Sequence, residues 1–141
     1  MEGIDWSELE SKILLTAQNY FNTVIPKGRW DSRAKVLAWW NLYGADNHHC
    51  WHSHPNSLFS GTYYVYMDEK SVPIEFRSPI GSLIQSWNCM FGLNTRWVQG
   101  VKIKPETNDI LMWPSWLDHS VPNQNELSDN LRCTISFNIV K

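Results

Sequence analysis

The first apolar pattern in the chain has a helical period. Between Asp5 and Val24, apolar side chains recur every three or four residues, which places them along one face of an α-helix. The set comprises Trp6, Leu9, Ile13, Ala17, Tyr20 and Val24. Pro26 ends the helix, because the residue before a proline avoids helical dihedral angles. We expect this helix to pack against the rest of the fold through its apolar face.

Beyond Pro26 the apolar positions recur in short segments that have the two-residue period of β-strands. The clearest alternation runs from Leu131 to Val140, where the apolar side chains share one face and Arg132, Thr134, Ser136 and Asn138 share the other. Residues 80–95 show neither period clearly, which predicts a long surface loop that is also a candidate lid. Further strands are expected at residues 35–43, 52–54, 61–67, 73–76 (a short, edge-like piece), 97–103 and 110–113.

Several short strands separated by turns, without alternating helices, are typical of an antiparallel sandwich or barrel. A length of 141 residues suits one domain. The chain shows no internal repeat, low-complexity segment or linker. We therefore expect a single, mainly β domain over residues 1–141, with a helix at about 5–24 and a β core at about 35–140. Two antiparallel sheets should face each other, with the helix packed outside.

Composition narrows the class of protein. With 43% hydrophobic and 18% charged residues, the chain is typical of a globular protein. A net charge of −2 without a run of Lys or Arg gives no electrostatic basis for binding nucleic acid. No apolar stretch is long enough to span a membrane, and the first residues lack the apolar core of a signal peptide. Cys50, Cys89 and Cys133 form no C-x-x-C pair, which is consistent with reduced thiols in a cytoplasmic protein.

Histidines are the main candidates for chemistry. His52 and His54 lie two residues apart in an extended segment, so their rings point the same way from α-carbons about 6.6 Å apart. His119 follows the apolar run 110–113 and a turn, and an antiparallel sandwich can bring it beside the pair. These three side chains could hold one metal ion. Because H-x-H pairs are common by chance, solvated surface histidines are the alternative.

Arg132 strengthens the metal hypothesis. It opens the strand at residues 131–140 on the polar side, thirteen positions after His119. From there its guanidinium can point into a cavity and bind a carboxylate through two parallel hydrogen bonds. The alternative is an exposed arginine on a solvated sheet face.

Three stretches resemble the motifs of a family of 2-oxoglutarate- and Fe(II)-dependent oxygenases found in bacteria and phages. Residues 52–65, HSHPNSLFSGTYYV, resemble its H-x-H-P-x-S-x-x-S-G-x-Y-Y-V signature. Residues 109–123, DILMWPSWLDHSVPN, are similar to G-D-L-x-x-F-P-S-W-L-x-H-x-V-x-P-N, with Trp113 in place of Phe and one residue missing before Pro122. Residues 132–138, RCTISFN, resemble R-x-S-I-S-F-N. The resemblance covers about residues 37–139.

This resemblance implies a double-stranded β-helix, the jelly-roll or cupin-like fold, with an N-terminal packing helix. It also implies a dioxygenase that uses Fe(II), 2-oxoglutarate and O2 to oxidise, by hydroxylation, a prime substrate. Residue by residue, His52, His54 and His119 take the metal positions, and Arg132 takes the position that binds the distal carboxylate of 2-oxoglutarate. Tyr64 lies where related enzymes place a second hydrogen bond to the cosubstrate, and Thr62 shares its face.

One position departs from the wider superfamily, which has a carboxylate ligand where this chain has His54. Three neutral imidazoles leave the full charge on the metal, which should weaken iron retention or shift its redox behaviour. The close family carries the same H-x-H. Asp46 or Asp118 could supply a carboxylate instead, although Asp118 would face away from His119 in an extended segment. Cys50 is expected to be a small core residue and not a ligand.

Two other functions fit the same residues. Zinc on three histidines with a bound water would form a hydrolytic site. A cupin-like module with a degraded metal site could instead bind a ligand in a Trp-rich cavity or serve a structural role in a phage particle. The sequence specifies neither the prime substrate nor the oligomeric state.

Overall fold

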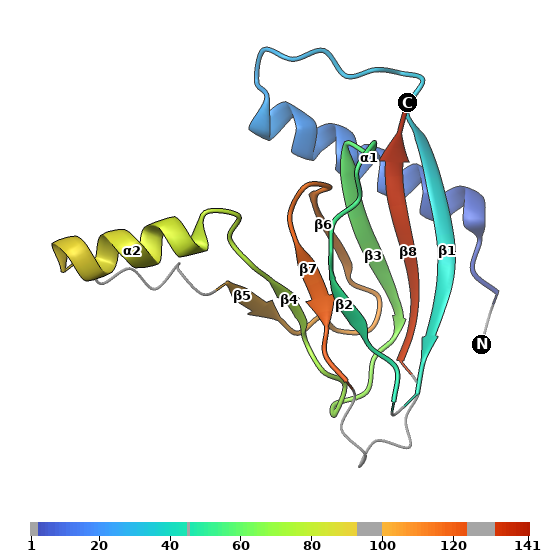
Figure 1. The fold of residues 1–141 in the computed structure, drawn as a ribbon. Helices are drawn as coiled ribbons and strands as arrows, with labels where there is room; N and C mark the ends of the chain where they lie inside the picture. Colours follow the sequence, from blue (N-terminus) through green and yellow to red (C-terminus); the bar gives the residue numbers. More distant parts are fainter. Residues whose placement is uncertain (1–2, 45, 93–99, 124–131) are drawn as a thin grey trace.

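The chain folds into two four-stranded antiparallel sheets that face each other, with a helix on the outside of one of them (Figure 1). This computed structural model describes residues 3–44, 46–92, 100–123 and 132–141. The elements in order are α1 (Trp6–Val24), β1 (Lys35–Tyr43), β2 (His49–His52), β3 (Phe59–Tyr66), β4 (Ile74–Phe76), α2 (Gly81–Phe91), β5 (Val101–Ile103), β6 (Ile110–Pro114), β7 (His119–Val121) and β8 (Arg132–Val140). The mainly β fold predicted from the strand pattern is confirmed.

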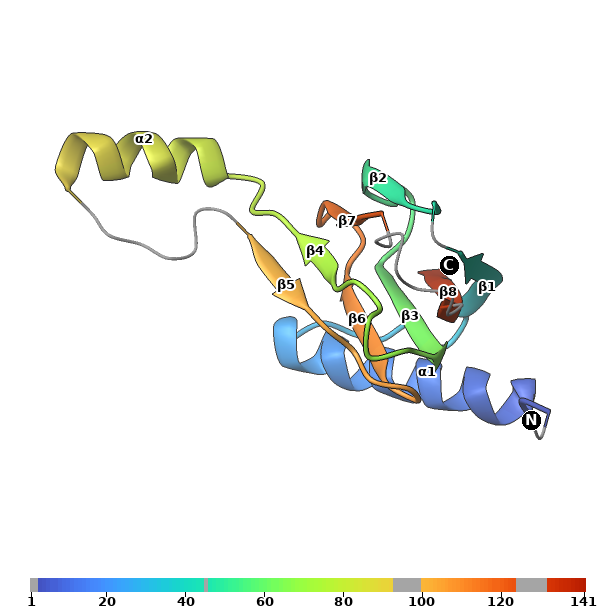
Figure 2. The ribbon, with the colours of Figure 1, turned by 90° about the horizontal axis from the view of Figure 1, so that it is seen from below.

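The larger sheet has the order β1-β8-β3-β6, and α1 covers its outer face (Figure 2). Leu9, Ile13 and Ala17 of α1 are buried against side chains of β3 and β8. The sheet side of this core consists of Phe59, Ile135, Phe137 and Ile139. Trp6 was expected in the same contact but remains 41% exposed, because it lies in an open groove beside the edge strand β1.

The smaller sheet has the order β2-β7-β4-β5 and supplies the other wall of the interior. Side chains from both sheets meet in a second core, formed by Tyr43, Ile74, Phe76, Trp113 and Val121. The strand predicted at residues 73–76 is present as β4, but the prediction that it lies at an edge is wrong, because β4 pairs with both β5 and β7. Pro73 precedes the strand, so the sheet loses no hydrogen-bond donor.

Gly61, in the middle of β3, leaves room for groups of the two neighbouring strands, β8 and β6. A Cβ atom at this position would lie 2.3 Å from Cζ of Phe137 and 2.5 Å from the carbonyl oxygen of Leu111. A larger residue would therefore displace the Phe137 ring or the neighbouring strand β6. This contact gives a physical reason for the glycine in the S-G-x-Y-Y-V stretch.

Two further expectations from the sequence are corrected. Residues 80–95 were expected to form a loop, but Gly81–Phe91 is helix α2, which extends away from the two sheets (Figures 1 and 2). Its apolar residues Leu83, Ile84 and Trp87 do have helical spacing, which the intervening polar residues obscured. Cys50 is exposed and not in the core, since β2 is an edge strand of the smaller sheet.

The strand expected at residues 97–103 corresponds to β5, which runs from Val101 to Ile103. Residues 97–99 of the expected range lie outside the described part. The expected lid also extends to residues 93–95, which lie outside it as well. Among the described residues, no helix combines the length and apolar character needed to cross a membrane.

Candidate functional site

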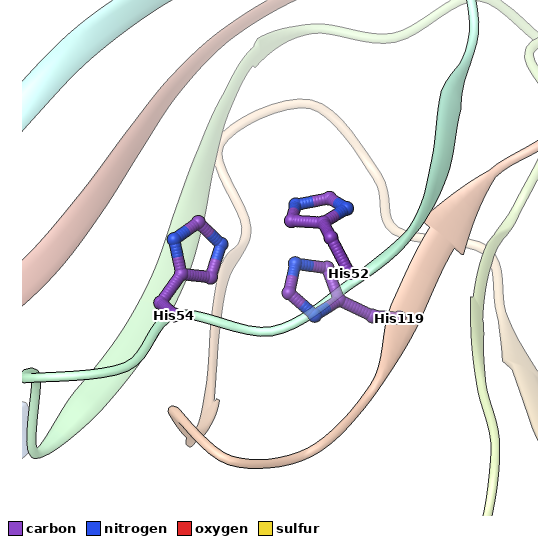
Figure 3. A group of neighbouring side chains, drawn as sticks. All are labelled: His52, His54 and His119. Atoms are coloured by element: carbon purple, nitrogen blue, oxygen red, sulfur yellow. The ribbon is translucent and has the colours of Figure 1, made fainter.

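The three histidines singled out in the sequence lie together between the sheets (Figure 3). His52 ends β2 and pairs directly with His119, the first residue of β7. His54 follows two residues later, where its backbone N–H donates to the carbonyl oxygen of Ser115 at 2.9 Å. One potential ligand atom from each ring lies within 4.8 Å of the others. No carboxylate of the described residues joins this group.

The alternative carboxylate ligands lie elsewhere. Asp118 forms an ion pair with Arg77 at 2.8 Å, so its carboxylate is already occupied. Asp46 does not belong to the histidine group. The donor set in this part of the structure is therefore three imidazoles.

Two of the rings are oriented by backbone carbonyls. Nδ1 of His52 lies 2.7 Å from the carbonyl oxygen of Cys50, and Nδ1 of His119 lies 3.0 Å from that of Leu117. Because a carbonyl oxygen only accepts hydrogen bonds, each Nδ1 must carry the proton. Nε2 of both rings is then left with a free lone pair, which is the arrangement that metal-ligating histidines use.

The surroundings of His54 and His119 favour their neutral forms. Burial lowers the pKa of His119 to about 4. The pKa of His54 is also lowered, first by burial and then by the neighbouring His52. Only an unprotonated imidazole can bind a cation, so the lowered pKa values of these two rings favour metal binding at neutral pH.

Arg132 lies in the same cavity as the histidines. The cavity encloses about 130 Å³, and the described residues around it include His52, His54, His119, Thr62 and Arg132. Arg132 is only 2% exposed, although arginine is rarely buried unless paired. No acidic residue in the described ranges forms an ion pair with it. Its NH1 group donates to the Val72 carbonyl oxygen over 3.4 Å, and its Nε has no partner in the described part of the chain.

A comparison with protein families agrees with the resemblance of the sequence motifs to an oxygenase family. The family model described as "Putative 2OG-Fe(II) oxygenase" matches residues 37–138. The chain belongs to this oxygenase family. The matched range includes all three histidines and Arg132.

Solved structures of oxygenases share the fold. A prolyl-4-hydroxylase from Pseudomonas putida aligns with a TM-score of 0.58 at 10% identity, over 91% of this chain and 62% of its own. A 2OG-Fe(II) oxygenase family oxidoreductase from Burkholderia pseudomallei aligns with a TM-score of 0.55 at 11% identity, over 92% and 57%. A structure from the study of Phytophthora capsici prolyl 4-hydroxylases gives a TM-score of 0.51 at 15% identity, over 95% and 41%.

These comparisons define the extent of the likeness. The chain spans between about two fifths and three fifths of the length of these three solved structures. At such low identity, the likeness concerns the fold of the oxygenase and not its substrate. A search of curated proteins gave no match.

The other two oxygenase positions predicted from the motif differ in their exposure to the cavity. Thr62 contributes to its wall, and its hydroxyl lies 3.4 Å from that of Ser136. Tyr64 is fully buried against Arg132, whose Cζ lies 5.2 Å from the centre of its ring. Its hydroxyl has no hydrogen-bond partner among the described residues, and burial raises its pKa to about 12. Tyr64 therefore remains a neutral phenol beside the guanidinium.

Sequence reasoning missed several other residues of the cavity wall, among them Trp39, Tyr43 and His49. The Tyr43 ring also lies against Arg132, with its centre 5.1 Å from Cζ, and its hydroxyl is 3.5 Å from Nδ1 of His49. Trp39 and Tyr43 alternate along β1 on the face that points inward. That alternation was available in the sequence, but it could not show which face of β1 meets the cavity.

The described part of the candidate lid, residues 80–92, does not line this cavity. None of the described residues of α2 contributes to its wall. The helix instead exposes apolar side chains, including Trp87 and Phe91, to solvent.

Proposed function

We propose that this protein is a 2-oxoglutarate- and Fe(II)-dependent dioxygenase that hydroxylates a prime substrate. One observation carries the proposal: the three-histidine group and the buried Arg132, which has no acidic partner in the described ranges, belong to the wall of one cavity. A metal-binding group and a carboxylate-binding group so arranged fit a ligand that has a metal-chelating end and a distant acid end.

His52, His54 and His119 are the residues that would hold the iron. Neutral nitrogen donors suit Fe(II) among other transition metals. When bound, the metal and 2-oxoglutarate would supply the oxidation, in which O2 converts 2-oxoglutarate to succinate and CO2 and adds one oxygen atom to a substrate C–H bond.

Arg132 would bind the distal carboxylate of 2-oxoglutarate. Its charge is not balanced by an acidic side chain in the described ranges, and its Nε lacks a partner. A carboxylate would supply both the opposite charge and the missing acceptor. The hydroxyls of Thr62 and Tyr64 would add hydrogen bonds to the same ligand.

The cavity wall has a second task, which is to limit access of water. The aromatic rings of Tyr43 and Trp113 line the cavity, and the rings of Tyr43 and Tyr64 lie against Arg132. Electrostatic attraction between Arg132 and a carboxylate is stronger in such surroundings than in water. This environment would favour contact of the distal carboxylate of 2-oxoglutarate with Arg132 over hydration of that carboxylate.

Turnover of 2-oxoglutarate tests the proposal. Protein purified without oxygen is supplied with Fe(II), 2-oxoglutarate and O2, and succinate is measured by mass spectrometry. We expect succinate formation that requires Fe(II) and is lost in His119→Ala. His48→Ala is the matched control, because His48 is exposed and is not part of the histidine group.

The other outcomes separate the competing functions. Tightly held zinc without succinate formation would favour the hydrolytic site. Absence of any bound metal would favour a binding module. Either result would reject the dioxygenase.

A further inference from the structure

The ring of His54 is held differently from the other two rings of the histidine group. Its Nδ1 lies 3.4 Å from the side-chain amide nitrogen of Asn138, whereas Nδ1 of His52 and of His119 faces a backbone carbonyl oxygen. In Figure 3, one ring nitrogen of His54 points toward the other histidines and the other points away from them. The partner of the outer nitrogen therefore decides what the inner nitrogen can do.

With the Asn138 side-chain amide in its present orientation, His54 is not ready to bind a metal ion. An amide NH2 group only donates, so Nδ1 of His54 must accept and use its lone pair. The proton of the neutral ring then lies on Nε2, which cannot bind a metal in that tautomer. His52 and His119 are poised to bind, but His54 is not.

Rotation of the Asn138 amide by half a turn would reverse this situation. The amide oxygen now accepts from the Ser60 hydroxyl at 2.7 Å, and the Ser60 and Ser115 hydroxyls lie 2.9 Å apart. After rotation, the amide NH2 would donate to Ser60 and Ser60 would donate to Ser115. The amide oxygen would accept from Nδ1–H of His54, which frees Nε2.

Both arrangements form a continuous series of hydrogen bonds from His54 through Asn138 and Ser60 to Ser115. Ser60 and Ser115 are 1% and 2% exposed, so water cannot easily replace either partner. Asn138 is fixed in β8, directly opposite Ser60 in β3. The network therefore has two continuous hydrogen-bond patterns, which differ in the orientation of the Asn138 amide.

We propose that Asn138 is the positioning residue that sets the tautomer of His54, and that metal binding selects the pattern in which the amide oxygen accepts. This inference rests on the proposed metal site. It assigns a role to the last residue of the RCTISFN stretch and explains how a third histidine is made competent where other oxygenases have a carboxylate. It places Arg132 and Asn138 on the same face of β8, with one serving the acid end of the cavity and the other serving the metal end.

Metal affinity measured by competition titration, with Fe(II) under anaerobic conditions, tests the assignment. In Asn138→Asp the carboxylate can only accept, so Nδ1 of His54 should keep its proton and the affinity should equal or exceed that of the parent. In Asn138→Leu no acceptor remains, and the affinity should fall about 10- to 100-fold, the usual effect of losing such a partner. Asn41→Leu is the control: this amide donates to Ser136 at 2.8 Å, on the same sheet but away from the histidines.

Nitrogen-15 NMR of the histidine rings gives a readout that requires no metal. We expect the His54 resonances to shift toward the Nδ1–H tautomer in Asn138→Asp. This measurement still decides the question if Asn138→Leu does not fold. Equal tautomer populations in parent and Asn138→Asp would overturn the assignment, as would equal metal affinity in all variants.

The histidine variants distinguish this failure from that of the proposed function. If His52→Ala and His119→Ala lose metal while His54→Ala retains parental affinity, His54 is not a ligand and the Asn138 inference fails alone. If the parent itself binds no metal, both proposals fail.

Discussion

Buried polar atoms without partners are concentrated around one cavity of this protein. The Tyr64 hydroxyl, the Trp113 indole Nε1 and the Arg132 Nε are all buried and lack a hydrogen-bond partner among the described residues. Each such group costs about 1–3 kcal/mol when water is removed from it. A ligand that supplied acceptors would recover part of this free energy on binding. The free-energy cost of these buried polar atoms is consistent with a site that binds a polar ligand.

Replacement of Tyr64 by phenylalanine should separate stability from ligand binding. Because the hydroxyl has no partner, Tyr64→Phe should leave the free energy of unfolding unchanged or raise it by up to about 1 kcal/mol. The affinity for 2-oxoglutarate should fall by roughly 1 kcal/mol, since the ligand loses a hydrogen bond. Urea denaturation and calorimetric titration measure the two quantities.

The adjacent Tyr63 provides the control. Its hydroxyl donates to Oδ1 of Asn108 at 3.0 Å, on the α1 side of the sheet. Tyr63→Phe should cost about 0.5–1.5 kcal/mol of stability and should not affect the ligand. A Tyr64→Phe variant that is as destabilised as Tyr63→Phe, or that binds 2-oxoglutarate like the parent, would argue against a ligand role for Tyr64.

Among the elements, α1 makes the contact that closes the outer face of the larger sheet. Asp5 caps the helix through side-chain bonds to the N–H groups of Ser7 and Glu8. Three of its apolar residues then face β3 and β8. The opposite face of β8 carries Arg132, so the packing of α1 supports the strand that forms part of the site.

Two substitutions in α1 test how much this contact contributes. Ile13 is fully buried, and Ile13→Ala should lower the free energy of unfolding by about 2–5 kcal/mol through lost packing and a residual cavity. Leu15 is 59% exposed, and Leu15→Ala should change the free energy of unfolding by less than about 0.5 kcal/mol. Chemical denaturation distinguishes them. Equal losses in the two variants would mean that α1 is not anchored by this face.

The sequence predicted elements best where a single period extended over many residues. The alternation in β8 and the helical stripe of α1 were both readable, because one face of each is buried. In α2 the helical spacing over eleven residues does not identify a helix, since short apolar runs with polar insertions fit either period. β4 was placed at an edge because pairing partners far along the chain are not visible locally.

The site was predictable only in part, because contacts between segments far apart in the chain cannot be read from the local sequence. H-x-H spacing, the later His119 and the polar face of β8 indicated which residues could meet. The contact between Asn138 and His54 was not predictable, because it depends on the register of β8 with β3 and on the segment that follows β2. Tyr43 and His49 were missed because neither matches a motif.

For the whole molecule, the buried histidines make stability depend on pH. The pKa of His119 falls from its ordinary 6.5 to about 4 on folding, mainly through burial. Between these two values the unfolded chain binds a proton that the folded chain does not, so acid favours unfolding. The shift corresponds to roughly 3 kcal/mol. The lowered pKa values of His54 and His49 act in the same direction.

In metal-free protein, the free energy of unfolding should therefore decrease steadily as the pH falls from about 6.5 to about 4. The contribution of His119 should be complete above 6.5 and lost below 4. Denaturant titrations in the presence of a chelator, at several pH values, measure the slope. His119→Gln should flatten it, and an unchanged slope in that variant would show that His119 is not the buried titrating group.

The most direct test asks whether one cavity binds both the metal and the cosubstrate. Anaerobic calorimetry measures the binding of 2-oxoglutarate to the Fe(II)-loaded parent and to the Fe(II)-loaded Arg132→Lys variant. Lysine keeps the charge but loses the planar pair of donors. The affinity for 2-oxoglutarate should therefore fall by roughly 1.5–3 kcal/mol, the scale of a charge-assisted hydrogen bond. Affinity for Fe(II) should remain nearly unchanged. Equal 2-oxoglutarate affinity in the two proteins, or no binding to the parent, would contradict the account.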